Sequence, residues 1–273
     1  MLQVARLAPK MLGESKDLVT GFLERQQMDG AFLDRSGNPD LYYTVFGLEC
    51  LRALSGDLPV ESTSAWLRTF DSGDALDLVH LSSLIRCWAN VTRVPPPVIA
   101  DPAAARLNEF EANNLYHCFL ALGAYQDLQR EPRRPMEFLD CVKRLQSGDG
   151  AYANHPGVPH GMTSATAAAI AILRQFGAVV PSGLGDWLLE RRHSSGGFFA
   201  SPSAPIPDLL STATALHALT SMQIPLDSIR ESVLDFLDSL WTARGGFVGS
   251  WADNTLDCEY TYYGLLALGH LSL

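Results

Sequence analysis

The chain has 273 residues, of which 47% are hydrophobic and 18% are charged, and its formal net charge is −10. A chain of this length is long enough for one large domain or two small ones. The acidic balance argues against nonspecific nucleic-acid binding, which depends on Lys and Arg contacts to phosphate. The N-terminus has no long apolar stretch of the signal-peptide type, and no uncharged run approaches the roughly 20 apolar residues of a membrane span.

The number and spacing of the cysteines indicate whether the protein belongs in an oxidising or a reducing compartment. Their number is odd and no C-x-x-C motif occurs, so neither a disulfide framework nor a zinc-finger pattern is indicated. A reducing environment fits this usage, and we expect a soluble cytoplasmic protein. The cysteines are Cys50, Cys87, Cys118, Cys141 and Cys258.

A repeated pattern runs along the chain. Each copy has a turn, usually Gly-rich and followed by Phe or Tyr, then a polar loop and an apolar segment that generally starts near an acidic residue. The clear copies span residues 26–51, 145–173, 191–219 and 242–268, and weaker copies span 71–88 and 110–125. The apolar segments start at Asp40, Asp77, Glu111, about Gly161, Asp208 and Asp257, which lie 34 to 50 residues apart. Such a period is typical of one helix pair per repeat.

Amphipathic segments precede most of the apolar ones. Ile229, Val233, Phe236 and Leu237, for example, have the spacing of one buried helix face. The segments of this kind are 15–27, 62–70, 134–146, 183–192 and 228–241. The apolar segments that follow are apolar on nearly all sides, which is typical of buried helices.

These two kinds of segment predict an all-α fold, an (α/α)6 toroid in which six outer amphipathic helices surround six inner buried ones. Six pairs can close into a ring, which removes the exposed ends of an open solenoid. The Gly-rich turns would join outer to inner helices because Gly adopts positive φ readily. We expect one toroid domain over residues 15–273 after an N-terminal extension of residues 1–14, with Asp40 and Asp257 on neighbouring inner helices.

The acidic residues that start the apolar segments have two interpretations. Asp is among the best N-cap residues, and a carboxylate suits the positive end of a helix dipole, so capping explains most of the set. Glu259 lies two residues after Asp257, where capping requires no second carboxylate. For this pair we weigh a helix cap against a catalytic role at the mouth of a cavity.

The repeat resembles the one shared by protein prenyltransferase β-subunits and squalene/terpene cyclases, over about residues 15–271. The resemblance implies an (α/α)6 toroid whose central apolar cavity holds an isoprenoid. The single-domain length is more similar to a β-subunit, because the related cyclases usually carry a second toroid domain. The resemblance therefore favours prenyl transfer, with a possible helical-repeat partner subunit.

In β-subunits, the resemblance implies a zinc ion that is held by an Asp-x-Cys-Tyr motif and by a His of the next repeat. Asp257 and Tyr260 match the motif, but Glu259 occupies the cysteine position, and Tyr43 stands where the His should be. Zinc sites prefer His and Cys, and Tyr is a poor ligand. The zinc ligand set is incomplete, so we expect weak or absent zinc binding. If a metal binds, Asp257 and Glu259 are the expected ligands.

Two positions resemble the diphosphate site of the family. His160 in "PHGM" is similar to the His of an Ala-His-Gly-Gly element, and Arg35 is similar to the basic residue of an Asp-Lys-Pro-Gly loop. The Arg and Lys that normally precede the Asp-x-Cys-Tyr motif are missing, and Trp251 and Asn254 lie near their places. With fewer cations, a diphosphate would be held less well.

The cyclases carry Asp-x-Asp-Asp-Thr at the same point of the repeat, and its middle Asp is the general acid that protonates an alkene or epoxide. The sequence "DCEYT" at 257–261 places Glu259 at that acid position. The second function class is therefore a cyclase or isomerase with Glu259 as acid. The third is a non-catalytic binding protein that has lost the zinc site.

The aromatic residues and the remaining histidine also have two interpretations. Tyrosines at the helix starts either pack or line a cavity, since aromatic rings suit isoprenoid chains and developing carbocations. His80 occupies the repeat position of the zinc His, although a core histidine is the simpler interpretation. The candidate catalytic residues are Asp257, Glu259 and Tyr260, and the candidate substrate-binding residues are His160, Arg35, Tyr42, Tyr43 and His80.

Overall fold

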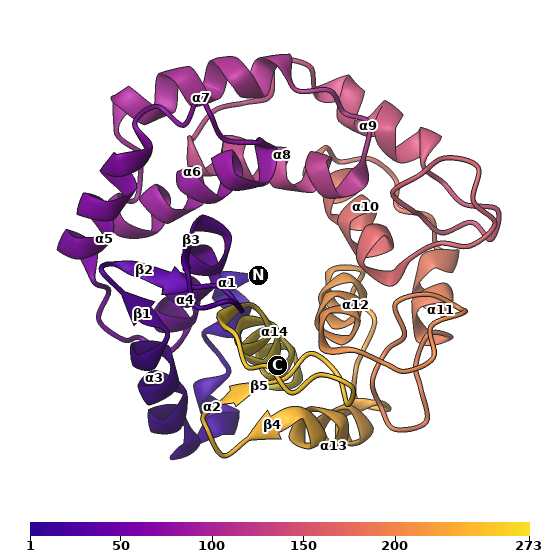
Figure 1. Cartoon of the computed structure of the whole chain (residues 1–273). Coiled ribbons are helices and arrows are strands. Elements are labelled where there is room, and N and C mark those ends of the chain that lie inside the picture. Colours follow the sequence, from indigo (N-terminus) through magenta and orange to yellow (C-terminus); the bar gives the residue numbers. More distant parts are fainter.

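Two concentric layers of helices form a closed ring in the computed structural model, which describes residues 1–273 (Figure 1). The inner layer consists of α4 (Leu41–Ala53), α6 (Leu78–Thr92), α8 (Leu115–Asp127), α10 (Thr163–Gln175), α12 (Leu209–Ser221) and α14 (Cys258–Leu271). The outer layer consists of α3 (Ser15–Arg25), α5 (Val60–Leu67), α7 (Pro97–Glu109), α9 (Pro135–Arg144), α11 (Gly183–Leu189) and α13 (Arg230–Leu240). Each inner helix packs against the next, and α14 returns to α4. The predicted all-α (α/α)6 toroid is confirmed, with Asp40 and Asp257 at the starts of neighbouring inner helices.

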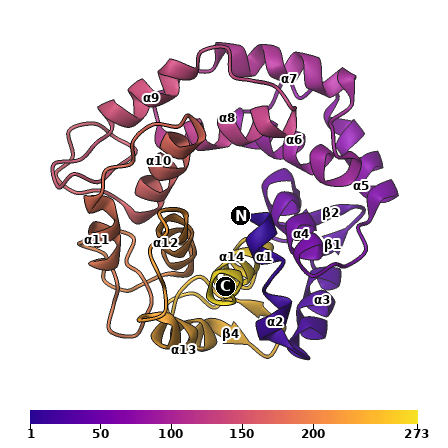
Figure 2. The same ribbon diagram turned by 180° about the vertical axis from the view of Figure 1, so that it is seen from behind.

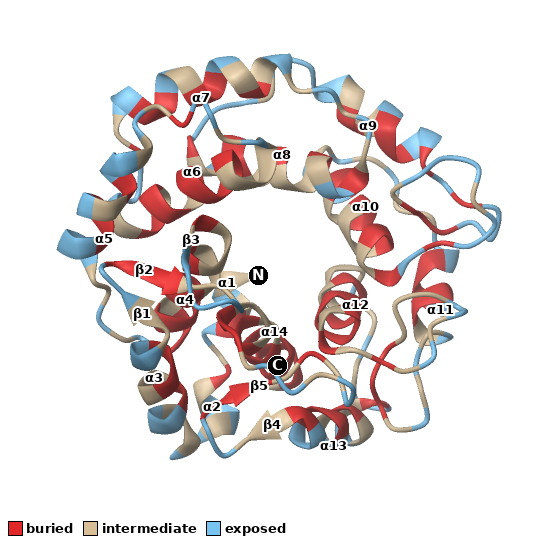
Figure 3. Ribbon diagram, viewed as in Figure 1, coloured by how far each residue is buried: buried red, intermediate tan, exposed pale blue.

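The two layers differ in burial, as the periodicity of the sequence predicts. Inner helices are buried over most of their surface, whereas outer helices have one buried face and one exposed face (Figure 3). In α13, for example, Val233, Phe236 and Leu237 are buried. The buried apolar side chains of both layers form one continuous core between them.

The N-terminal segment packs against the ring. Seen from behind, α1 (Leu2–Ala5) lies near the centre beside α14 and α4 (Figure 2). Ala5 and Ala8 are completely buried, and α2 (Pro9–Leu12) also contacts α14. Residues 1–14 are thus part of the packed structure, while the domain boundary at residue 15 stays a prediction.

Most inner helices start at a capping aspartate. The side chains of Asp40, Asp77, Asp208 and Asp257 each accept a hydrogen bond from the backbone N–H three residues on. Each bond satisfies a donor that the first helical turn would otherwise leave free.

The expected start at Glu111 is wrong. Asn114 caps α8 by accepting a hydrogen bond from the His117 N–H, and Glu111 is exposed in the preceding loop. Asn caps a helix as well as Asp does, so the nearest acidic residue does not mark the start of this helix. The start near Gly161 is displaced by one residue, because Met162 precedes α10 and makes no side-chain cap.

The Gly-rich turns form small hairpins. Two of them contain short strands, namely β1 (Gln27–Met28), β2 (Ala31–Leu33) and β3 (Pro39–Asp40) in the first repeat, and β4 (Trp241–Thr242) and β5 (Gly246–Phe247) in the last. The repeated threonine joins each turn to its helix. Thr44 Oγ1 accepts from the Phe32 N–H at 2.8 Å and donates to the Asp40 carbonyl at 2.6 Å. Thr212 makes the same two bonds, to Phe198 and Asp208.

Gly245 of the last repeat lies against α3 of the first repeat, which gives the first stability prediction. Its φ is +93°, and an added Cβ would lie 2.0 Å from the Leu18 carbonyl oxygen of α3. Gly37 has a similar φ of +83° but has nothing within 4 Å of the Cβ position. We expect Gly37→Ala to lower the free energy of unfolding by about 1–2 kcal/mol, from backbone conformation alone. Gly245→Ala should cost at least about 3 kcal/mol, because α3 must also move away.

Denaturant unfolding of both variants measures the difference. Equal losses for Gly37→Ala and Gly245→Ala would show that the close approach of Gly245 to α3 contributes nothing to the loss of stability.

Candidate active site

The first and last repeats meet where α4 and α14 lie side by side. Tyr42 and Glu259 each lie two residues after their N-cap, and Phe46 and Tyr263 each lie six residues after it. Positions four apart share one helix face. These four side chains are half-buried, whereas most of the surface of both helices is buried, so they face the interior of the ring.

Glu259 is held by a tyrosine inside this group. The Tyr42 hydroxyl donates to Glu259 Oε1 at 2.6 Å. The Tyr42 ring contacts Phe46 edge-on at 5.0 Å between centroids, and Phe46 lies 5.7 Å from Tyr263. Burial raises the pKa of Glu259 above its ordinary value, and the Asp257 charge adds to this, although the Tyr42 hydrogen bond and Arg35 lower it. Burial among aromatic rings therefore favours the protonated form of Glu259 more than water does.

Asp257 is engaged differently, although it is only two residues away. It is 1% exposed, caps α14 through the Tyr260 N–H at 2.7 Å, and accepts from Arg35 Nε at 2.7 Å. Arg35 also pairs with Asp253 through Nη2 at 2.9 Å and lies over the Tyr260 ring at 5.1 Å. This cluster ties the first repeat to the last. It places Tyr260 beside Arg35, and burial raises the pKa of that tyrosine to about 12.

Tyr43 and His80 lie beside the helix caps. Burial, together with the charges of Asp257 and Glu259, raises the pKa of Tyr43 to about 12. His80 contacts the caps of two inner helices, with Nδ1 2.8 Å from Asp77 Oδ1 and Nε2 3.8 Å from the second cap, Asp40 Oδ2. Of the eight candidate residues, Tyr42 and Glu259 are the pair whose side chains bond to each other and face the interior.

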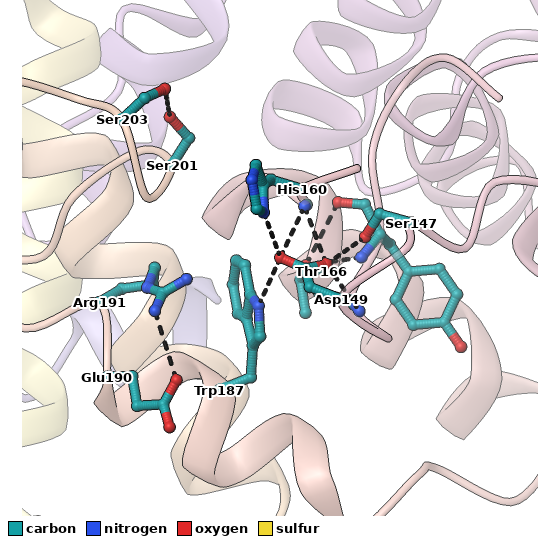
Figure 4. A network of polar contacts seen from close by, with 12 residues as sticks. Ser147, Asp149, His160, Thr166, Trp187, Glu190, Arg191, Ser201 and Ser203 are labelled. Atoms are coloured by element: carbon teal, nitrogen blue, oxygen red, sulfur yellow. Dashed lines mark hydrogen bonds and ion pairs between the residues drawn. The ribbon is translucent and has the colours of Figure 1, made fainter. Parts of the chain in front are cut away.

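His160 belongs to the loop before α10, which lies opposite α4 in the ring order. Its side chain is 61% exposed, and Nδ1 lies 3.5 Å from Asp149 Oδ2. Asp149 also accepts hydrogen bonds from Ser147, Trp187 and the Gly161 N–H (Figure 4). Although burial opposes it, these bonds lower the pKa of Asp149 to about 2. His160 therefore does not join Arg35 in one anion site.

The side chains near Glu259 do not fit a zinc ion. No three His, Cys, Asp or Glu side chains lie close enough together to hold a metal. The oxygens of Asp257 are bonded to Arg35 and Tyr260, and the nearby Cys258 is completely buried. The donor chemistry agrees with this, since zinc prefers His and Cys.

Zinc content follows as a prediction. Protein purified without chelator should contain much less than one zinc per chain in elemental analysis, because the thiolate and imidazole of the family's ligand set are replaced by Glu259 and Tyr43. One zinc per chain that survives dialysis would contradict this interpretation of the site.

Farther along the inner helices, charged side chains take the place of aromatic ones in the interior. The sequence patterns did not predict this charged group. Arg86 of α6 donates to Glu49 of α4 at 3.0 Å and also pairs with Asp127 of α8. Glu49 is only 5% exposed. The aromatic part of the interior lies in the first two turns of α4 and α14, and Tyr116 of α8 lies near Tyr42. The missed signal was the presence of charged residues within otherwise apolar helices.

Comparisons with known proteins agree with this architecture. The family model described as the prenyltransferase alpha-alpha toroid domain matches residues 10–83, 99–183 and 180–272. No curated protein sequence matches the chain. None of the helices combines the length and hydropathy needed to cross a membrane.

Solved structures of two kinds are similar to the chain. A wild-type glycosidase has a TM-score of 0.58 at 13% identity, covering 98% of this chain and 96% of that one. A glycosidase variant in complex with glucose has a TM-score of 0.55 at 12% identity, with the same coverage. Candida albicans protein geranylgeranyltransferase-I complexed with GGPP has a TM-score of 0.50 at 15% identity, covering 99% of this chain and 81% of that one. At these identities the likeness establishes the fold alone.

Proposed function

The chain belongs to the prenyltransferase alpha-alpha toroid family, and from this premise we propose that it binds an isoprenoid or similar unsaturated apolar molecule inside the ring, with Glu259 as proton donor. The observation that carries the proposal is the Glu259 carboxyl group, held by Tyr42 at 2.6 Å beside Phe46 and Tyr263. A general acid needs a raised pKa and a position next to the substrate, and this interior-facing group has the first property.

The proposed chemistry needs no metal. Glu259 transfers its proton to a carbon of the double bond, which leaves a carbocation that the faces of neighbouring aromatic rings stabilise. The Tyr42 hydroxyl stabilises the carboxylate that forms. Glu259 then regains a proton from a carbon next to the cation, so the net reaction is an isomerisation or a cyclisation.

Prenyl transfer, which the sequence resemblance favours, is the second candidate. The similar Candida albicans protein geranylgeranyltransferase-I is complexed with GGPP, which supports an isoprenoid diphosphate as ligand. A diphosphate requires free cations, whereas Arg35 is paired with Asp253 and Asp257. Prenyl transfer would also imply a helical-repeat partner subunit. The buried, unpaired cysteines support the cytoplasmic location that we propose for either activity.

Incubation in D₂O separates the two candidates. The chain is mixed with linear isoprenoid hydrocarbons, isoprenoid alcohols and GGPP, and products are analysed by mass spectrometry and for released diphosphate. Proton donation by Glu259 predicts products with a new C–D bond. The rate should fall as pH rises through the raised pKa of Glu259, because the acid form is lost. Diphosphate release from GGPP with an acceptor, without deuterium uptake, would instead support prenyl transfer and overturn the proposal.

A further inference from the structure

An open pocket with a cavity volume of about 250 Å³ lies between the inner helices α10 and α12, and two of its lining residues, Arg174 and Gln175, are exposed. One of its lining residues, His217, lies nine residues after the N-cap of α12, whereas Glu259 lies two residues after the N-cap of α14. At 1.5 Å per helical residue, the cavity is about 10 Å farther along the inner layer than Glu259. It is therefore separate from the site proposed above.

Small side chains leave this space open. Three alanines, Ala167, Ala171 and Ala218, line the cavity where longer side chains would meet across the two helices. A methyl group at each position leaves room for a small ligand, whereas close packing would fill it.

The polar lining is rich in hydrogen-bond donors. It consists of Arg174, Gln175, His217 and Ser221, and includes no carboxylate. No hydrogen bond or ion pair engages the side chain of Arg174 or Gln175, whereas Arg86 pairs with two carboxylates elsewhere in the interior. Ser221 donates to the Ala218 carbonyl at 2.8 Å. The available donors are thus a guanidinium group, an amide and an imidazole.

A histidine pair adjoins the cavity. His217 Nδ1 lies 3.0 Å from His270 Nε2, and His270 is 3% exposed with no partner for its Nδ1. Burial lowers the pKa of His217 to about 4 and that of His270 to about 3, so both rings are neutral at pH 7. His217 Nε2 has no partner in the protein and is free to interact with a ligand.

We propose that this cavity binds a small oxyanion, a carboxylate or a phosphate group, between Arg174, Gln175 and His217. Arg174 supplies the positive charge, and its planar guanidinium can donate two parallel hydrogen bonds to such a group. His217 then donates to the ligand through its Nε2–H and accepts at Nδ1 from the Nε2–H of His270. In this arrangement His270 carries its proton on Nε2, so none of its N–H groups is unpaired. The proposal does not depend on the function of Glu259.

Calorimetric titration of the full chain with inorganic phosphate and with acetate, at constant ionic strength and pH 7, tests the site. Arg174→Gln removes the charge, and Ala171→Leu fills the cavity. Arg68→Gln is the matched control, because Arg68 is exposed on the outer layer and its side chain has no partner. We expect saturable binding at one site per chain. Arg174→Gln should weaken it by about tenfold or more, and Arg68→Gln by no more than about twofold.

The titrations distinguish a phosphate ligand from a carboxylate ligand, and they can also show that the pocket binds neither. Binding of phosphate alone identifies a phosphate group as the ligand, binding of acetate alone identifies a carboxylate, and binding of both shows that the site accepts either oxyanion. A change in the His217 Nε2 resonance on titration would support direct contact. If neither anion saturates the protein, or if Arg68→Gln weakens binding as much as Arg174→Gln, the proposal is wrong. Arg174→Gln keeps the test valid even if Ala171→Leu does not fold.

Discussion

Glu259→Gln is expected to abolish turnover of an unsaturated apolar substrate while leaving the ring folded. The amide keeps the size of the side chain, and its carbonyl oxygen can still accept the Tyr42 hydrogen bond, but it has no acidic proton to transfer to a substrate. General acid catalysis contributes about 10²–10⁴-fold to a rate, so a loss of at least that order is expected in kcat. Product formation in D₂O measures the loss, and Glu111→Gln, in an exposed loop, is the control.

The stability of the same variant relative to the parent should depend on pH in a predictable direction. Because burial raises the pKa of Glu259 in the folded state, its contribution to stability is fully present below the ordinary carboxyl pKa. That contribution is lost as pH rises through the raised pKa, where the buried group ionises. Glu259→Gln should therefore be as stable as the parent in acid and slightly more stable at pH 8, by no more than about 1 kcal/mol. Full activity with a large loss of stability would mean that Glu259 is structural.

Tyr42→Phe tests whether the pKa of Glu259 controls the pH dependence of the rate. Removing the hydroxyl takes away the hydrogen bond that lowers the pKa of Glu259. The alkaline limb of the pH–rate profile should move to higher pH, which loss of packing alone would not produce. An unchanged limb would show that Glu259 is not the titrating group.

Arg35→Met should strongly destabilise the ring, because it leaves the Asp257 carboxylate without its ion-pair partner. Asp257 is 1% exposed, and breaking a buried pair typically costs about 3–5 kcal/mol. Arg35 itself is 37% exposed, and solvent screening weakens its side of the pair, so we expect a loss of about 2–3 kcal/mol. Arg35→Met/Asp257→Asn should recover most of it, since the amide carries no charge.

Chemical denaturation of the single and double variants measures this coupling. Arg130→Met is the control, because Arg130 and Asp101 form an exposed pair and its loss should change stability by less than about 1 kcal/mol. If Arg35 instead serves mainly as a diphosphate ligand, as its resemblance to the family loop implies, Arg35→Met would leave stability unchanged and weaken GGPP binding.

The repeated sequence pattern was sufficient to predict the toroid. Apolar periodicity distinguished outer from inner helices, because burial on one face or on all faces leaves different patterns in the chain. The aspartates at positions 40, 77, 208 and 257 marked helix starts correctly, since capping is a local interaction. The weaker third repeat was misplaced at Glu111 because Asn114 supplies the same local chemistry.

The roles of individual site residues depended on contacts between distant parts of the chain. Asp257 and Glu259 are two residues apart in sequence, yet Arg35 engages the first and Tyr42 the second. Both partners are more than 200 positions away and reach the pair only because the ring closes. His160, which resembles a diphosphate ligand, lies beside Asp149 and across the ring from Arg35, because the order of the inner helices places α10 opposite α4.

The sequence by itself therefore determined most of the helix pairs, their two layers and most of their starting points, because these follow from local propensity and from the burial period of each helix, whereas no amphipathic segment was identified for α7. Only the tertiary structure decided that Tyr42 and Glu259 share the interior, that Arg35 is neutralised by two carboxylates, and that three alanines open a cavity beside His217. The physical reason is that ion pairing, desolvation and cavity shape are set by neighbours in space, which ring closure brings together from opposite ends of the chain.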